Sequence, residues 1–321
     1  MSFIMNIRSV AKYESKILVR SWFFRIFTLL AVVFLGFFNF AMMLMEDNFG
    51  LWFAKSVSSN IPYLNLLLLN TGQAVVAVFL SSEFLKRDKK LDTSEVFYVR
   101  PLSNAEYVVG KIWGNLRVFL FLNLLVLAIV LAFNFMASGV TVDLPAYLVY
   151  FFLISIPTLI FIIGLSIFLM LLLNNQALTF ILLLGYIGLT LFYIQDKFYY
   201  LFDYMVYNLP LFKSTIVGFS NLELILNHRA IYFFAGLGFI FFTIFLFKRL
   251  PNARRSHYPW LFLSFCMFLL MVTAGFRHVR SILWEGEMRA LYTSINNKYV
   301  YEPKMAIDYY DISVEQKSET I

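Results

Sequence analysis

The residues best suited to recognising a partner are gathered in one segment, because 11 of the 45 charged residues lie between Glu83 and Lys111. Within this segment, the run KRDKKLDTSEVFYVRPLS occupies residues 86–103. Basic residues beside apolar stretches commonly mark the cytoplasmic side of a membrane protein and need no other role. The same run also contains helix-start and helix-stop residues, which topology alone does not explain.

Two capping boxes follow in quick succession; in each, an N-cap residue and an acidic residue three positions later bind each other's backbone N–H groups. The first is Asp92-Thr-Ser-Glu95, and Pro101 ends the helix that it begins. The second is Ser103-Asn-Ala-Glu106, which begins the next helix. These spacings predict a short helix of about two turns between two longer helices. A surface that keeps its shape in this way suits the docking of a partner.

Motifs for catalysis are missing from the sequence. There is no G-x-x-x-x-G-K-[ST] phosphate loop and no H-E-x-x-H zinc motif. The histidines His228, His257 and His278 are far apart in sequence, and the single cysteine, Cys266, lies in an apolar run. No Asp, Glu or Lys lies at the centre of an apolar run, which disfavours an ion-driven carrier. We therefore expect no catalytic residue, metal site or cofactor in this chain.

Neutral polar residues do occur within the apolar runs. Asn65, Asn70 and Gln73 lie in the second run, Asn123 lies in the third, and Thr190 lies in the fifth. Such residues often hold membrane helices together by hydrogen bonds. Alternatively, some of them line a translocation route at an interface between subunits, for which the candidates are Asn65, Asn70, Gln73 and Thr190.

The composition predicts an all-α polytopic membrane protein. The chain is 61 % hydrophobic and 14 % charged, whereas soluble domains are about half apolar and a quarter charged. Seven apolar runs approach or exceed the length of about 20 residues that crosses a bilayer. They occupy residues 26–44, 63–82, 118–136, 147–173, 177–193, 231–247 and 258–276.

The distribution of Lys and Arg predicts a cytoplasmic N-terminus in the inner (plasma) membrane of a cell. That orientation places 16 of these residues on inner segments and 4 on outer loops. The four outer residues are Lys55, Lys197, Lys213 and Arg229. Because membrane topology accounts for the net charge of +7, we expect no nucleic-acid partner.

Residues 1–20 predict an amphipathic helix that lies at the inner membrane interface. Its basic residues recur every four positions and form one stripe: Arg8, Lys12, Lys16 and Arg20. We expect this stripe to face the headgroups of membrane lipids. Glu14 falls within the apolar arc, where a carboxylate needs a partner to offset its desolvation. That partner is either a neighbouring basic residue or a group in a cytoplasmic loop or another protein.

Two further segments have their own character. Residues 197–228 are too polar to cross a bilayer and too aromatic for a free loop, so we expect a helical pair at the outer surface. Residues 251–277 contain a seventh span, which places the tail at 278–321 outside. If this run is instead a re-entrant or surface helix, the tail is cytoplasmic. The tail alternates polar and apolar residues as a strand does. It is either a short appendage or the start of a further domain.

The order of these elements over residues 1–250 resembles the permease subunits of type-2 ABC exporters. The matching stretches are KYESKILVR in the first helix and RPLSNAEYVVGK after the short helix. The second stretch carries the family pattern onto Pro101, Ser103, Gly110 and Lys111. The resemblance implies a six-span permease core at 21–250, whose coupling helix at about 92–99 docks on a separate ATPase subunit that holds ATP and Mg.

The resemblance also implies pairing with a second permease copy or a related permease half. The residues assigned to ATPase coupling are Glu14, Asp92, Glu95, Tyr98, Arg100, Pro101, Ser103, Gly110 and Lys111. The seventh span departs from the six-span pattern, and the tail resembles the first strand of the extracytoplasmic peptidase-like domain fused to some permeases. A second hypothesis is therefore a membrane anchor or assembly platform for such a domain, which is absent from this chain.

Overall fold

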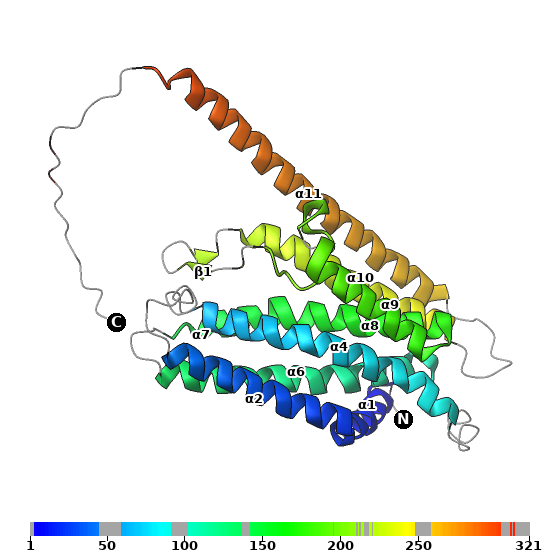
Figure 1. The fold of residues 1–321 in the computed structure, drawn as a ribbon. Coiled ribbons are helices and arrows are strands. Elements are labelled where there is room, and N and C mark those ends of the chain that lie inside the picture. The colour runs from blue at the N-terminus through cyan, green and yellow to red at the C-terminus, as the bar shows by residue number, and fades with distance from the viewer. Residues whose placement is uncertain are drawn as a thin grey trace. The chain divides into compact units, whose positions relative to one another are not determined.

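The structure is a computed structural model, and side chains at 82–90 and 214 are not described. The described residues are 3–44, 59–90, 102–136, 142–194, 196–209, 211, 213–214, 218–219, 221–247, 258–302, 309 and 311. Within them, seven helices are long and apolar enough to cross a membrane. The chain is therefore an all-α, multi-pass membrane protein, as the composition predicts (Figure 1).

The first half of the chain forms four long helices. The third span was predicted to begin at its capping box, well before its apolar run. These helices are α1 (Phe3–Arg20), α2 (Trp22–Leu44), α4 (Asn60–Lys90) and α6 (Asn104–Met136). Because α6 starts directly after Ser103, the N-cap residue of the second capping box, and runs unbroken to Met136, residues 104–117 and the third span form one helix.

The second half begins with α7 (Leu144–Tyr150), the π-helical turn η1 (Phe151–Ser155) and α8 (Ile156–Leu173), which together form the fourth span. The fifth span is α9 (Gln176–Leu189) with the π-helical turn η2 (Thr190–Ile194). The sixth and seventh spans are α10 (Leu222–Leu246) and α11 (Tyr258–Lys298).

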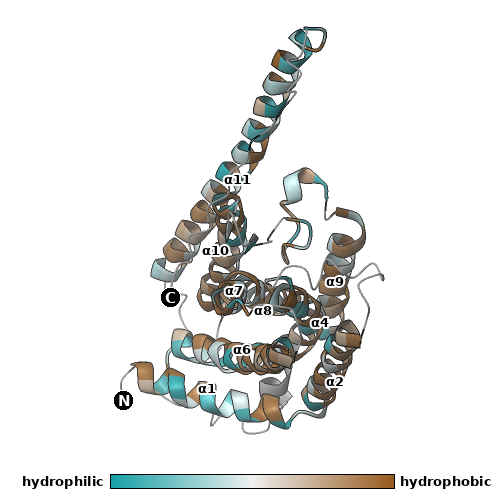
Figure 2. Ribbon diagram, turned by 90° about the vertical axis from the view of Figure 1, so that its left-hand side faces the viewer, coloured by the Kyte–Doolittle hydropathy of each residue, from teal (hydrophilic) through white to brown (hydrophobic). Residues whose placement is uncertain are grey.

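The bundle is built around α4 and α8, which are the most buried spans (Figure 2). The helices α6 and α10 pack against this centre, and α10 approaches α8 closely where Gly164 faces Gly236. By contrast, α2, α9 and α11 expose most of their apolar side chains. Such exposure suits helices that are surrounded by lipid.

The segment expected to form an outer helical pair has a different structure. It contains the 3-10 turn η3 (Phe198–Tyr200) and the two-stranded hairpin of β1 (Lys213–Ser214) and β2 (Gly218–Phe219). All three residues of η3 have positive φ angles, a left-handed conformation that cannot continue as a right-handed helix. The second expected helix is instead the start of α10, which continues into the sixth span.

The seventh helix is also longer than predicted, since α11 continues from the apolar run through Lys298. Residues 278–298 of the expected strand-like tail are therefore helical. After Pro259 in its first turn, the next proline is Pro303, so no proline interrupts the helix. The chain divides into two compact units, Met1–Val279 and Arg280–Ile321.

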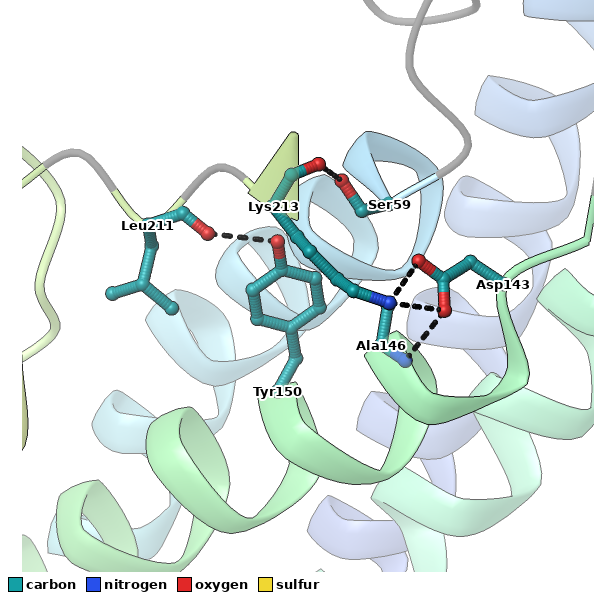
Figure 3. Close-up of polar contacts among 6 residues, drawn as sticks. All are labelled: Ser59, Asp143, Ala146, Tyr150, Leu211 and Lys213. Atoms are coloured by element: carbon teal, nitrogen blue, oxygen red, sulfur yellow. Dashed lines mark hydrogen bonds and ion pairs between the residues drawn. The ribbon is translucent and has the colours of Figure 1, made fainter. Parts of the chain in front are cut away.

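The connection between α9 and α10 is anchored to the ends of α4 and α7 (Figure 3). Lys213 Nζ lies 2.6 and 2.8 Å from the two carboxylate oxygens of Asp143, the N-cap residue of α7. Tyr150 Oη donates to Leu211 O at 2.7 Å, and Ser59 Oγ donates to Lys213 O at 3.0 Å. These bonds hold the hairpin segment on the bundle.

The fourth span is interrupted by Pro157, and Arg229 of α10 binds the backbone at this break. Proline has no N–H, so Leu153 O loses its usual helical donor four residues later. Arg229 Nε donates to Leu153 O at 2.6 Å, and Nη2 lies 3.3 Å from Ile154 O. The guanidinium thus replaces the hydrogen bonding that the proline and the π-helical turn remove.

This position corrects the assignment of Arg229 to an outer loop, because its side chain is only 2 % exposed within the bundle. Its Nη1 also donates to Tyr204 O at 2.7 Å, which ties the α9–α10 connection to the break in the fourth span. Asp203 lies nearby; burial raises the pKa of its carboxyl, while backbone N–H groups and the charge of Arg229 oppose that shift. Arg229 is therefore a structural link among three segments.

We expect Arg229→Lys to lower the free energy of unfolding by about 3 kcal/mol, because a single ammonium cannot reach the acceptors that the planar guanidinium spans. Thermal unfolding of the detergent-solubilised protein measures this loss. The matched control is Arg277→Lys at an exposed position of α11, with an expected change within about 0.5 kcal/mol. Equal effects of the two substitutions would contradict the linking role of Arg229.

Candidate functional site

The first helix packs along the first turns of α6, and two glycines of α6 allow the close approach (Figure 2). A Cβ atom on Gly110 would lie 2.7 Å from Val10 Cβ. A Cβ atom on Gly114 would lie 2.8 Å from Glu14 Cβ and 2.9 Å from Ala11 O. Any larger residue would therefore push the two helices apart. We call this surface the α1–α6 contact.

Hydrogen bonds from side chains of each helix to the other helix strengthen the α1–α6 contact. The hydroxyl of Ser15 lies 2.7 Å from Gly114 O. Arg117 of α6 donates from Nε to Ser15 Oγ at 2.5 Å and from Nη2 to Ala11 O at 2.8 Å. Because these bonds involve main-chain atoms of both helices, they fix the register of α1 on α6.

The second predicted capping box is confirmed, and it has an additional contact. Ser103 N donates to Glu106 Oε2 at 2.6 Å, and Glu106 N donates to Ser103 Oγ at 3.2 Å. The other carboxylate oxygen of Glu106 accepts from Asn6 Nδ2 at 2.8 Å. One acidic side chain therefore caps α6 and holds the start of α1.

A buried ion pair lies at the centre of the α1–α6 contact. Lys111 Nζ is 3.5 Å from Glu14 Oε2, and both side chains are less than 5 % exposed. The ammonium also lies 5.1 Å from the centre of the Tyr107 ring, within the range of a cation–π contact. Lys111 is thus a basic partner of Glu14. Glu14 was expected to need a partner because it lies on the apolar arc of the first helix.

The predicted coupling residues divide into two groups. Glu14, Gly110 and Lys111 lie in the α1–α6 contact, and Ser103 caps the start of α6. The others lie outside the described residues and stay predictions: Asp92, Glu95, Tyr98, Arg100 and Pro101.

Three residues proposed for a translocation route are buried between helices. Asn70 Nδ2 donates to Asn123 Oδ1 at 3.0 Å, and Asn123 Nδ2 donates to Gln73 Oε1 at 2.7 Å. Asn65 exchanges two amide hydrogen bonds with Asn39 of α2, at 2.7 and 3.0 Å. These contacts favour the interpretation that the amides hold helices together.

The fourth candidate, Thr190, is also buried, and its hydroxyl donates to Ile187 O at 2.8 Å. A place on a route between subunits stays a prediction for all four residues.

A pair of histidines was not expected from the sequence. The rings of His228 and His278 have centroids 5.0 Å apart, and each Nε2 donates to a carbonyl of the left-handed turn, at Tyr200 O and Tyr199 O respectively. No group of three or more His, Cys, Asp or Glu side chains that could hold a metal occurs in the described part of the chain. The pair therefore joins α10 and α11 to the turn.

Comparison with known proteins adds no relative. No protein-family model matches the chain, and no curated protein matches its sequence.

We expect a double-mutant cycle on Glu14→Gln and Lys111→Met to show an interaction free energy of about 1–3 kcal/mol, because buried charges in contact are strongly coupled. Unfolding of the single and double variants in detergent measures it. The control cycle uses Glu223→Gln and Arg277→Met, an exposed pair at 3.0 Å whose coupling should stay below about 1 kcal/mol. Additive effects at Glu14 and Lys111 would show that the pair is not coupled.

Proposed function

We propose that this chain is the membrane permease subunit of an ATP-binding cassette exporter, driven by ATP hydrolysis in a separate subunit. The observation that carries the proposal is the buried Glu14–Lys111 ion pair, which fixes α1 to α6 directly after the predicted docking helix. The ATPase partner would supply the ATP, the Mg and the catalytic residues. The distribution of Lys and Arg supports a cytoplasmic N-terminus in the plasma membrane, the side on which such an ATPase would dock.

A force applied at residues 92–99 would reach the membrane through α6. The capping box at Ser103 and Glu106 fixes the start of this helix, and the helix continues without a break to Met136. Because α1 is bonded to the same turns, the two helices would move as one body. A rigid link of this kind transmits a displacement without losing it in a flexible loop.

Pairing with a second permease copy is supported by the exposed apolar helices. In α2 and α9, a Cβ atom added at Gly36, Gly185 or Gly188 would meet no atom within 4 Å. Small residues on an open helix face allow another helix to approach closely in a membrane. A second copy or a related permease half would complete this side of the bundle.

The alternative function is a membrane anchor or assembly platform for an extracytoplasmic domain. The length of α11 favours it, because 41 residues exceed the roughly 20 that cross a bilayer. This alternative requires no ATPase on residues 92–99, so the following experiment also separates the two proposals.

We expect Glu95→Arg combined with Tyr98→Ala to abolish copurification of the ATPase, because charge reversal and loss of an aromatic anchor together remove about 2 kcal/mol or more, over tenfold in affinity. The tagged chain is purified from its native membrane, and the associated P-loop protein and its ATP hydrolysis are measured. The control is Lys89→Gln with Lys90→Gln, which should keep both. Absence of an ATPase, or its retention by the first variant, would contradict docking at this helix.

A further inference from the structure

The C-terminal part of α11, residues 280–298, carries an apolar stripe beyond the apolar run that ends at residue 276. This part of the helix belongs to the second compact unit. Trp284, Leu291 and Ile295 are exposed there, and Met288 is half-buried. Because an α-helix turns by about 100° per residue, these four side chains lie within an arc of about 60°. We call them the α11 seam.

The spacing of the α11 seam is that of a coiled coil. Its members follow one another after four, three and four residues, which assigns Trp284 and Leu291 to d positions of a heptad and Met288 and Ile295 to a positions. Isoleucine at a with leucine at d favours a parallel pair of helices. A narrow stripe of a and d residues suits another helix, whereas a helix that covers a broad core needs a wider apolar face.

Membrane insertion makes a second copy of this chain a suitable partner for the α11 seam. All copies of a polytopic protein insert with the same orientation, so residues 280–298 lie on the same side of the membrane in each copy. Because α11 is continuous from Tyr258 to Lys298, its apolar run places the seam at the same height in each copy. Two such helices therefore meet in parallel and in register, so that equivalent residues pair.

The charged residues beside the seam are compatible with this arrangement. In a parallel coiled coil, each g residue faces the following e residue of the partner helix. Within α11, the facing pairs are Arg280 with Glu285 and Glu287 with Tyr292. Glu285 also lies 3.9 Å from Arg289 of its own helix, and its second carboxylate oxygen can accept from another guanidinium. One facing pair is thus opposite in charge and neither is of like charge.

Four apolar layers would be marginal for two free helices. The next a position is Ser281 and the next d position is Lys298, so the seam ends there. In this chain, however, the helix is already formed by its continuation from the span, and both copies are confined to one membrane. Confinement raises the effective concentration at which the two seams meet, so a small contact is sufficient.

We propose that residues 284–295 of α11 pair with the same residues of a second copy of this chain as a parallel two-stranded coiled coil. The pairing does not depend on the proposed ATPase or on the exposed faces of α2 and α9. It would apply equally to the exporter and to the membrane anchor.

The test is disulfide cross-linking of the full chain in its membrane, with Cys266, the single cysteine, replaced by Ala. One cysteine is then introduced, either by Leu291→Cys on the seam or by Thr293→Cys on the opposite face. After oxidation with copper phenanthroline, a non-reducing gel measures the covalent dimer. Paired helices bring Cα atoms on the seam to about 4–6 Å, within the reach of a disulfide, and leave those on the outer faces about 13–15 Å apart.

We therefore expect Leu291→Cys to form the dimer about tenfold faster than Thr293→Cys, since only the first pair of thiols is within bonding distance. Equal rates at the two positions, which random collision in the membrane would give, overturn the proposal. The absence of a dimer at Leu291→Cys, or a covalent adduct with a different protein, also overturns it.

A second comparison tests the apolar character of the seam, with the reporter cysteine at Met288. Leu291→Glu combined with Ile295→Glu should slow dimer formation about tenfold or more, because the pairing would bury unpaired carboxylates. The matched control, Thr293→Glu with Asn297→Glu, adds the same charge to the opposite face and should change the rate by less than about threefold. All four positions are exposed, so the helix bundle keeps its contacts. Equal effects of the two double variants overturn the proposal.

Discussion

Polar groups inside an apolar helix bundle must bind one another, because neither lipid nor a packed core supplies water. The arrangement of this chain follows from that constraint at several points. The guanidinium of Arg229 binds the carbonyls freed by Pro157, and amides join α4 to α6 and α2. At the α1–α6 contact, the ion pair of Glu14 and Lys111 has the same effect. Each of these contacts joins two different helices.

The α1–α6 contact combines this constraint with steric fit. Gly110 and Gly114 bring the backbones close enough for Ser15 and Arg117 to bind main-chain atoms of the opposite helix. The short distance in turn excludes water from the ion pair, which strengthens the attraction between its charges. The result is a rigid unit at one end of the bundle. The proposed docking of an ATPase would act on this unit.

Local features were predictable from the sequence, whereas long-range partners were not. The capping box of Ser103 and Glu106 depends only on residues three positions apart, and the structure confirms it. The sequence likewise showed that Glu14 needs a partner, but Lys111 could be named only once the helices were placed. Arg229 was assigned to a loop because Lys and Arg usually mark loops in membrane proteins. Pro157 alone predicts that Leu153 O lacks its usual helical donor. The residue that replaces this donor, Arg229, lies on a distant helix.

The binding of Arg229 has a consequence for how the chain is made. A lone guanidinium is costly in the bilayer, about 2.5–3.5 kcal/mol at its centre by insertion scales. All of the acceptors that the described residues provide, at Leu153, Ile154, Thr158 and Tyr204, precede it in the sequence. Because ribosomes synthesise a chain from its N-terminus, these acceptors leave the ribosome before the charge does. The order of synthesis thus makes every one of these acceptors available before Arg229 needs them.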